Sequence, residues 1–453
     1  MSLNQRRALY IFFILVFLTA TPLISLYATG YKLGRGGFNF QKTGMLIIDT
    51  EPEGAKIYLD GEVQQDFFKK IYAKNKSYIT TPAKIKNLLP GTYDVTVELP
   101  GFWPWRKKLT VHPGQSTFAE DISLFKKNVP ELSLSGDFSD ISVSPDNKNL
   151  LAIEYADDFA KFSLINLETE SEKTFTASAT DGLTLSWSPN NKKVIAGNFI
   201  FEIEDWDNPI SLNKLIGPRI KNVKWDAGNG NKVYYESAGG INCYDLSGNT
   251  EKLILNRPTL GDYLPDNDYL YFVDEETGSA NLSVWDLNDN KLFRKINLPD
   301  STYTFLNPGH SLINLYDNTH DILYLIDPFS AYKPLLETVS GVKRAHWVSD
   351  RTLLFANDFE IWVLNLTNHK KTLLTRIGQT LTGVIWHPNN NYVIFTTARS
   401  INAIELDDRE KYNITKLLEL EMVAYPAINK EGDGLYFFGK IGNQSGLYKL
   451  YIQ

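Results

Sequence analysis

The 453-residue sequence has a single cysteine, Cys243, and only six histidines. One cysteine excludes an intrachain disulfide and a thiolate metal cluster. The histidines, at positions 112, 310, 320, 346, 369 and 387, show no HxH or HxxxH spacing that would suggest a metal site. We therefore expect no bound metal, and we expect Cys243 to be a buried apolar side chain and not a reactive thiol.

Basic residues are also few relative to acidic ones. Lys and Arg number 46 against 53 Asp and Glu, which gives a formal net charge of −7. Because phosphate binding requires a dense basic face, nucleic acid is not expected as a partner. The aromatic content of 13% and the charged content of 22% are those of a folded protein.

Sequence signatures of catalysis are missing as well. The chain has no Gly-x-Ser-x-Gly nucleophile elbow and no glycine loop for phosphate. The run DLNDN at 286–290 has the acidity of a calcium loop but lacks its glycine and its distal glutamate. We predict no catalytic, cofactor-binding or metal-binding residues, no cofactor, and a protein that is not an enzyme.

What the sequence does contain begins with a long uncharged apolar run, ALYIFFILVFLTATPLISLYA, at residues 8–28. About twenty helical residues at 1.5 Å each cross a hydrocarbon core of about 30 Å. We predict a transmembrane anchor over 8–28, with residues 1–7 as a cytoplasmic tail. The alternative is a cleaved signal peptide, although the run is long for one and ends without a small-x-small cleavage site.

The orientation of this anchor depends on a close balance of positive charges. Arg6 and Arg7 precede the apolar run, whereas Lys32 and Arg35 follow it. The terminal amine adds to the first side, so the positive-inside rule favours a cytoplasmic N-terminus. We predict a single-pass membrane protein whose remaining chain is extracytoplasmic.

A linker at 29–42 leads to a segment, 43–126, of short alternating strands separated by proline and glycine turns. Tyr93, Val95 and Val97, for example, alternate with polar residues, which is the period of a half-buried strand. Five such strands between turns predict a small antiparallel β-sandwich.

This segment resembles the PEGA domain, named for the Pro-Glu-Gly-Ala that stands at 52–55. The resemblance continues through TPAKIKNLLPGTYDVTVELPGF at 81–102, although the insertion at 62–80 is longer than the family leads us to expect. It implies a non-catalytic surface module, often next to a membrane anchor, that contacts other proteins or cell-envelope carbohydrate.

Phe102, Trp103 and Trp105 are the candidate partner-binding patch of this segment. Two tryptophans separated by Pro104 cannot both point into one thin core, so an exposed ring is one interpretation. The alternative is that these rings pack against the edge of the domain or against its neighbour.

Residues 130–453 repeat about every forty residues. When the repeats are aligned, two sets of equivalent positions recur, which we call columns. Residues of the first column stand where a strand ends in a turn, and residues of the second column stand at the turn that closes a later strand. The first column contains Val143, Trp187, Trp225, Tyr263, Leu306, Trp347, Trp386 and Ile428, and the second contains Asn166, Asp205, Asp245, Asp286, Asp327, Asn365 and Glu405. Repeats of this length with three or four strands are typical of propeller blades.

The repeats resemble TolB-type and WD-like propellers, a resemblance that implies protein binding and no particular ligand. We count eight blades, or seven if one copy is misassigned. The last repeat has only three strands, and Leu132–Leu134 is expected to supply its fourth strand and close the ring.

These observations predict an all-β protein with an N-terminal transmembrane helix, a PEGA-like sandwich and a β-propeller. We expect a non-catalytic surface or envelope protein that mediates protein or glycan interactions. One alternative is an envelope transport or assembly accessory of TolB type. Another is an enzyme whose site lies in the propeller funnel, where several blades would contribute polar groups. The oligomeric state and the ligand stay open.

Overall fold

The computed structural model describes residues 3–34, 39–65, 78–156, 159–178, 185–257, 261–276, 279–306 and 312–453. Arg35, His310 and most of the insertion at 62–80 lie outside these ranges. The chain forms two compact units. Unit 1 comprises Met1–Val129, Ala403–Leu417 and Ile452–Gln453, and unit 2 comprises Pro130–Asn402 and Leu418–Tyr451.

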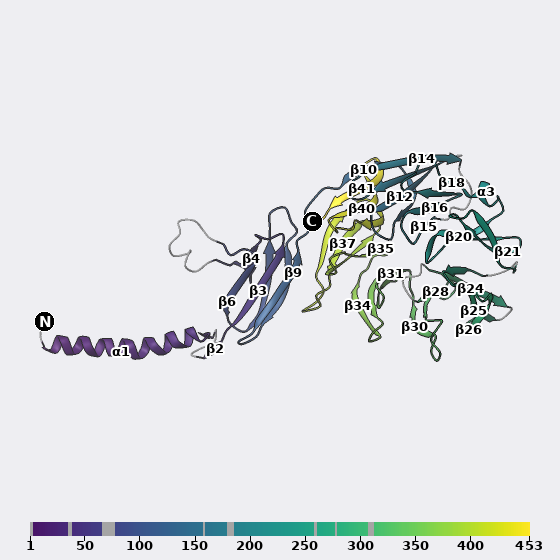
Figure 1. Cartoon of the computed structure of the whole chain (residues 1–453). Coiled ribbons are helices and arrows are strands. Elements are labelled where there is room, and N and C mark those ends of the chain that lie inside the picture. Colours follow the sequence, from purple (N-terminus) through teal and green to yellow (C-terminus); the bar gives the residue numbers. More distant parts are fainter. Residues whose placement is uncertain are drawn as a thin grey trace. The chain divides into compact units, whose positions relative to one another are not determined.

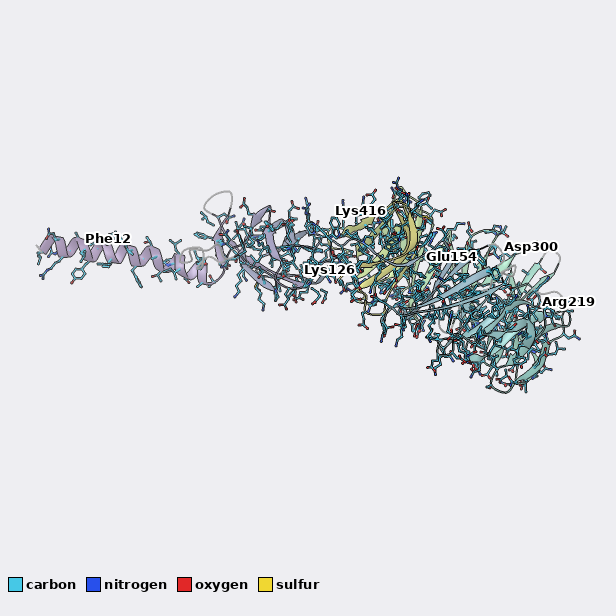
Figure 2. All side chains as sticks on the ribbon, turned by 90° about the horizontal axis from the view of Figure 1, so that it is seen from above. Phe12, Lys126, Glu154, Arg219, Asp300 and Lys416 are labelled. Atoms are coloured by element: carbon cyan, nitrogen blue, oxygen red, sulfur yellow. The ribbon has the colours of Figure 1, made fainter. Side chains whose placement is uncertain are left out.

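Unit 1 begins with the helix α1, Leu3–Ala28, which contains the apolar run. Its large apolar side chains are exposed, and Figure 2 shows Phe12 on this helix. The helix is long and apolar enough to cross a membrane, a test that a signal sequence also passes. The hydroxyl of Thr19 donates to the carbonyl of Leu15 at 2.8 Å, so this polar group is satisfied within the helix.

The rest of unit 1 is mainly β-structure, shown in Figure 1 as a hairpin followed by a two-layer sandwich. The strands are β1 (Tyr31–Leu33), β2 (Phe40–Lys42), β3 (Gly44–Glu51), β4 (Lys56–Leu59), β5 (Glu62–Val63), β6 (Ala83–Leu88), β7 (Gly91–Glu98), β8 (Trp105–Val111) and β9 (Ser116–Ser123). One layer has the order β5-β4-β7-β8 and the other β6-β3-β9. The predicted sandwich is therefore present, with one difference: β9 crosses to the second layer and runs parallel to β3.

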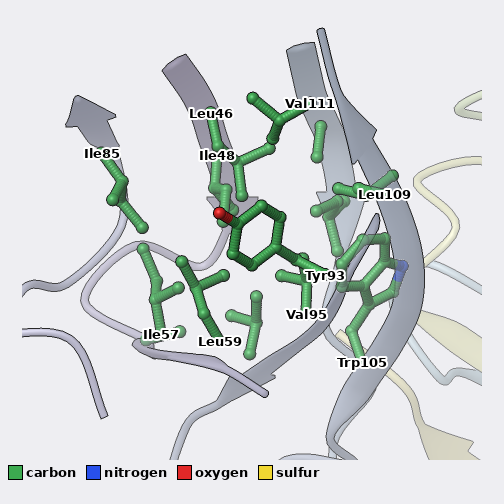
Figure 3. Packing of buried hydrophobic residues seen from close by; sticks show 14 of the residues in the cluster. Leu46, Ile48, Ile57, Leu59, Ile85, Tyr93, Val95, Trp105, Leu109 and Val111 are labelled. Atoms are coloured by element: carbon green, nitrogen blue, oxygen red, sulfur yellow. The ribbon is translucent and has the colours of Figure 1, made fainter. Parts of the chain in front are cut away.

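The sandwich encloses one apolar core because alternate residues of each strand point between the layers. In β8, for example, residues alternate regularly between buried and exposed. Figure 3 shows side chains such as Ile48, Val95 and Leu109 meeting between the layers. At the margin, the Thr81 hydroxyl lies 2.6 Å from that of Thr50, which satisfies two buried polar groups.

Unit 2 is built from consecutive four-stranded antiparallel sheets, the architecture of a β-propeller. Figure 1 shows these sheets following one another along the chain. The first four sheets are β11 (Phe138–Val143), β12 (Asn149–Ala156), β13 (Phe159–Asn166) and β14 (Glu172–Ser178); β15 (Leu185–Trp187), β16 (Lys193–Ala196), β17 (Phe199–Glu202) and β18 (Ile210–Ser211); β19 (Lys221–Asp226), β20 (Asn229–Ser237), β21 (Gly240–Asp245) and β22 (Thr250–Leu255); and β23 (Tyr263–Asp266), β24 (Tyr269–Glu276), β25 (Ser279–Asp286) and β26 (Lys291–Leu298).

The next three sheets continue this pattern, and a short helix, α3 (Leu212–Leu215), follows β18. They are β27 (Tyr303–Phe305), β28 (Ile313–Asp317), β29 (Ile322–Ile326) and β30 (Leu335–Ser340); β31 (Arg344–Ser349), β32 (Thr352–Ala356), β33 (Glu360–Asn365) and β34 (Lys370–Arg376); and β35 (Leu381–Trp386), β36 (Tyr392–Thr397), β37 (Ser400–Glu405) and β38 (Ile414–Glu419). In this last sheet, the end of β37 and most of β38 belong to the segment Ala403–Leu417 of unit 1.

A further sheet, the closing sheet, joins strands from distant parts of the sequence. It contains β39 (Met422–Ile428), β40 (Gly434–Ile441), β41 (Gln444–Tyr451) and β10 (Glu131–Ser135). In β10, Leu132 pairs with Tyr448 and Leu134 pairs with Leu447. The prediction that Leu132–Leu134 supplies the missing strand is confirmed.

Two tryptophans of the first sequence column connect neighbouring sheets. The indole N–H of Trp187 donates to the Ser142 hydroxyl at 3.1 Å, and that of Trp225 donates to the Ser186 carbonyl at 2.9 Å. In both cases the acceptor lies in the first strand of the preceding sheet. A large side chain with one donor is therefore suited to this position, because its ring packs between sheets while its N–H finds a partner.

The second column marks turns in which an Asn or Asp side chain binds the backbone just ahead of it. The side-chain oxygen of Asn166 accepts from the N–H of Thr169 at 2.8 Å, and Asp245 accepts from Ser247 at 2.9 Å. Asp286 does the same within DLNDN. The acidic run is therefore explained by its turn.

Candidate functional site

The three candidate patch residues of unit 1 do not form one exposed surface. Trp105 opens β8 on the buried face of the strand, and Figure 3 shows its ring beside Val95 and Leu109. Its indole N–H donates to Oε2 of Glu405 at 2.9 Å. Trp105 is thus part of the core, which agrees with the packing interpretation of this residue, and a partner-binding role for Phe102 and Trp103 stays a prediction.

Phe102 and Trp103 are both half-buried. Phe102 packs against the sandwich core, and the backbone N–H of Trp103 donates to the carbonyl of Phe125 at 2.7 Å. The ammonium of Lys127 lies 5.0 Å from the centre of the Trp103 ring, a cation–π contact. The indole nitrogen of Trp103 is buried and has no hydrogen-bond partner among the described residues.

Next to Trp105, unit 1 holds a buried ionic cluster. Lys107 is buried, and its ammonium lies 2.8 Å from Oδ2 of Asp407 and 3.7 Å from Oε2 of Glu405. Arg409 binds both carboxylate oxygens of Asp407, at 2.8 and 2.7 Å. This arrangement fixes the segment Ala403–Leu417 within unit 1.

The two carboxylates of the cluster respond differently to burial. Burial raises the pKa of Glu405, and the charge of Lys107 opposes this rise only in part. Burial would also raise the pKa of Asp407, but hydrogen bonds from Arg409 and Lys107 hold that pKa well below its usual range. Because each charge is paired, the cluster is structural.

The sequence did not predict a group of contacting, partly exposed rings in unit 2, the aromatic patch, made of Tyr269, Phe293 and Phe329. The ring centres of Tyr269 and Phe329 are 4.9 Å apart, and those of Phe293 and Phe329 are 5.8 Å apart. Phe293 is 49% exposed and Phe329 is 48% exposed. Rings that contact one another yet stay half in solvent form a small apolar surface.

An irregularity in β26 places Phe293 in the patch. In its pairing with β25, Leu292 lies opposite Trp285, whereas Arg294 lies opposite Val284. Phe293 is thus an extra residue in β26, as in a β-bulge, which redirects a side chain relative to regular alternation. The bulge therefore leaves Phe293 free to meet rings from other strands.

The loop between β29 and β30 contributes the other part of the patch. The carboxylate of Asp327 accepts from the backbone N–H of Phe329 at 3.0 Å. The guanidinium of Arg294 donates to the carbonyls of Pro328 and Ser330, at 3.0 and 2.6 Å. These bonds hold the loop from both sides, so Phe329 is presented on a fixed backbone.

The remaining candidate chemical groups of unit 2 have structural surroundings. Cys243 is buried, and burial raises its pKa to about 11, so the nucleophilic thiolate is rare at neutral pH. His387 is fully buried, with its Nε2 3.0 Å from the Gly432 carbonyl, and burial lowers its pKa. Within the described ranges, no three His, Cys, Asp or Glu side chains are grouped closely enough to hold a metal ion.

One half-buried charge pair connects three consecutive sheets. The ammonium of Lys224 in β19 donates to Oδ1 of Asp262, just before β23, and the other oxygen of Asp262 accepts from the N–H of Phe305 in β27 at 2.8 Å. Burial lowers the pKa of Lys224, and Asp262 opposes this effect. The pair therefore links sheets with its charges satisfied.

Comparison with known proteins identifies the type of domain that the sandwich of unit 1 forms. The PEGA domain family matches residues 69–124 of this chain. The chain contains a PEGA domain. The match covers β6 to β9 of the sandwich, and the structure places the eponymous Pro-Glu-Gly-Ala between β3 and β4 of the same sandwich.

Three solved structures have folds similar to the larger part of the chain. The Dos1 propeller is 12% identical, with a TM-score of 0.47 over 72% of this chain and 95% of that one. A chain of the mitotic checkpoint complex is 13% identical, with a TM-score of 0.38 over 72% and 89%. A eukaryotic initiation factor is 10% identical, with a TM-score of 0.45 over 70% and 86%. A search of curated proteins found no match.

Proposed function

We propose that this chain is a non-catalytic, single-pass membrane protein that binds a protein partner through the aromatic patch of its propeller, outside the cytoplasm. The exposed, mutually packed rings of the patch are the observation that carries the proposal. The PEGA domain supports a surface or interaction role at the family level. The propeller supports such a role as well, because closed β-rings hold binding loops rigidly.

The apolar helix supports the membrane part of the proposal. Twenty-six residues at 1.5 Å each give α1 a length of about 39 Å, enough for a hydrocarbon core of about 30 Å. Its side chains from Tyr10 to Leu18 are all exposed large apolar groups. Each apolar side chain left in water costs about 1.5 to 3 kcal/mol relative to burial, so a bilayer is the favourable surrounding.

The composition of the aromatic patch favours a protein over a glycan. Its centre is apolar, and charged side chains such as Lys291, Asp289 and Lys333 lie exposed next to it in the sequence. Protein interfaces share this plan of an aromatic centre with a polar rim. A few aromatic residues at such a centre usually carry most of the binding energy.

The proposal is tested by replacing Phe293 and Phe329 together with alanine in the full chain. Phe359→Ala is the matched control, because Phe359 is also 49% exposed in unit 2. Loss of two central rings is expected to weaken the binding of a cross-linked, isolated partner by about a thousandfold, since each such residue contributes about 2 kcal/mol. The control is expected to bind normally.

Two outcomes contradict parts of this proposal. If the double variant loses binding to an envelope glycan and has no protein partner, the ligand class is wrong. If both variants bind a partner as the unchanged chain does, the patch is not the interaction surface. Protease treatment of intact cells tests the orientation, because an extracytoplasmic propeller is digested from outside and a cytoplasmic one is protected.

A further inference from the structure

We propose that the two strands after the helix, β1 and β2, lie in the lipid headgroup layer with one face, the apolar face, turned toward the acyl chains. The apolar face carries Tyr31, Leu33 and Phe40, and Lys42 lies on the same side at the base of the hairpin. This inference rests on the proposed membrane anchoring and adds a second, peripheral membrane contact to it.

The pairing of the two strands defines this face. Leu33 lies opposite Phe40, and Tyr31 lies opposite Lys42. Residues two apart in a strand point to the same side, so these four side chains share one face and the pair Lys32 and Gln41 occupies the other. Leu33 is 52% exposed and Phe40 is 41% exposed. A two-stranded sheet is only marginally stable in water, so it needs a cover for this face.

The connection to the helix places the strands near the membrane surface. α1 ends at Ala28 and β1 begins at Tyr31. The carbonyl of Gly30, between them, accepts from both the N–H and the hydroxyl of Thr43, at 2.7 Å each. Because Thr43 follows β2 directly, this contact closes the base of the hairpin against the end of the helix.

The same threonine holds the strands to the sandwich. Thr43 is buried, and its carbonyl accepts from the N–H of Gly114 at 2.9 Å. The strands are thus tied to the helix at Gly30 and to the β8–β9 turn at Gly114. The apolar part of the helix, residues 8–28, is about 32 Å long and so matches a hydrocarbon core of about 30 Å. The chain therefore leaves the core near Ala28, and the strands that follow fall within the interfacial layer.

The composition of the two strands favours a lipid surface as the partner that covers the apolar face. Their sequences, YKL and FQK, contain two lysines and two aromatic residues and no acidic residue. Aromatic and basic side chains are enriched at membrane interfaces, where the rings enter the boundary and the ammonium groups meet phosphates. Anionic lipids add an attraction of about 1 kcal/mol for each basic residue near the surface.

The test measures depth in the full chain, reconstituted in vesicles of phosphatidylcholine and phosphatidylglycerol. In a Cys243→Ser background, single cysteines replace Leu33, Phe40, Gln41 or Phe17 and carry an environment-sensitive fluorophore. Lipids with a spin label high on the acyl chain, and aqueous iodide, are the two quenchers. Fluorophores at positions 33 and 40 are expected to be quenched by the spin-labelled lipid and not by iodide. Gln41, on the opposite face of the same strand, is the matched control and is expected to show the reverse.

The label at Phe17 in the helix distinguishes a failure of this inference from a failure of the proposed membrane anchor. If a label at Phe17 is quenched by the lipid while labels at 33 and 40 are quenched by iodide, the helix spans the bilayer and the apolar face does not touch it. Equal lipid quenching at 40 and 41 also overturns the assignment of this face. If the label at Phe17 is quenched by iodide, the membrane anchor itself is wrong, and the inference fails with it.

Discussion

The PEGA sandwich and the propeller are both built from short β-strands, but they bury their apolar residues differently. The sandwich has one core, in which residues from both layers, such as Leu46 and Val97, belong to a single cluster. The propeller has several smaller clusters, each shared by neighbouring sheets, as where Phe162 of β13 packs with Phe201 of β17. The sandwich therefore depends on one core, whereas the propeller distributes its stability around a closed series of sheets.

The two regions also differ in how they satisfy polar groups. The sandwich unit buries the charged pair of Lys107 and Glu405, and the half-buried Asp407 joins Lys107 to the exposed Arg409. The propeller also pairs charges, as between Lys224 and Asp262. It adds local turn bonds, such as that of Asp245, and single bonds between sheets, such as that of Trp225. A buried charge is costly when its partner is removed, while a lost turn bond costs about 1 kcal/mol. Loss of one partner from the Lys107 cluster should therefore cost more than loss of a turn bond in the propeller.

The largest effect is expected from Lys107→Ala. This change leaves the buried carboxylate of Glu405 without its cation, and removal of one partner from a buried ion pair costs about 3 to 5 kcal/mol. Hydrogen exchange of the β7 and β8 amides in the full chain measures this loss as a lower free energy of opening. We expect these amides to exchange faster while those of unit 2 are little changed.

Lys108→Ala is the control within the same strand. Lys108 lies 3.7 Å from Asp94, and both side chains are largely exposed. Such surface pairs contribute about 0 to 1 kcal/mol. Equal acceleration of exchange in the Lys107 and Lys108 variants would show that burial of the cluster does not contribute to stability, and the contrast drawn between the two units would not hold.

A smaller effect is expected at the closing sheet of the propeller from Gly446→Ala. A β-carbon at Gly446 would lie 2.4 Å from the carbonyl oxygen of Leu134, so β10 must move away from β41. Overpacking of this kind costs about 1 to 3 kcal/mol. We expect hydrogen exchange to accelerate more in β10 and β41 than in β20, which would show that the closing sheet opens more easily than the other sheets of the propeller.

Gly378→Ala is the control for this prediction, because a β-carbon there meets no atom within 4 Å. We expect its exchange to match that of the unchanged chain. If Gly446→Ala accelerates exchange equally in every sheet, the propeller opens as a single cooperative body. The propeller would then resemble the sandwich, because both units would unfold as a whole and not sheet by sheet.

The sequence predicted those features of each region that depend on local chemistry. The Pro-Glu-Gly-Ala turn indicated the sandwich, and the Asn and Asp column indicated the propeller, because a side chain that caps its own turn leaves a mark at a fixed position. The role of Leu132–Leu134 followed from counting strands, since a blade with three strands leaves an edge that another strand can pair with.

Features that depend on distant pairing were not predictable in the same way. Trp105 and Glu405 are 300 residues apart, and only the folded chain shows that they share a hydrogen bond. The aromatic patch depends on the register shift at Phe293 and on a loop of the next sheet that carries Phe329. Neither register nor the contact between sheets is recorded in the repeat pattern.

The smallest effect is expected inside the propeller, at Cys243 in β21. Burial raises the pKa of this thiol to about 11, so at pH 8 only about one folded molecule in a thousand carries the thiolate. Alkylation by iodoacetamide at pH 8 should be about a hundredfold slower in the folded chain than in urea, and it should accelerate toward pH 10. Because the folded pKa is raised, the neutral thiol stabilises the fold below about pH 8.5, and this contribution is lost as the pH rises through about 11. Equal alkylation rates with and without urea would mean that β21 opens readily, which a closed series of sheets does not permit.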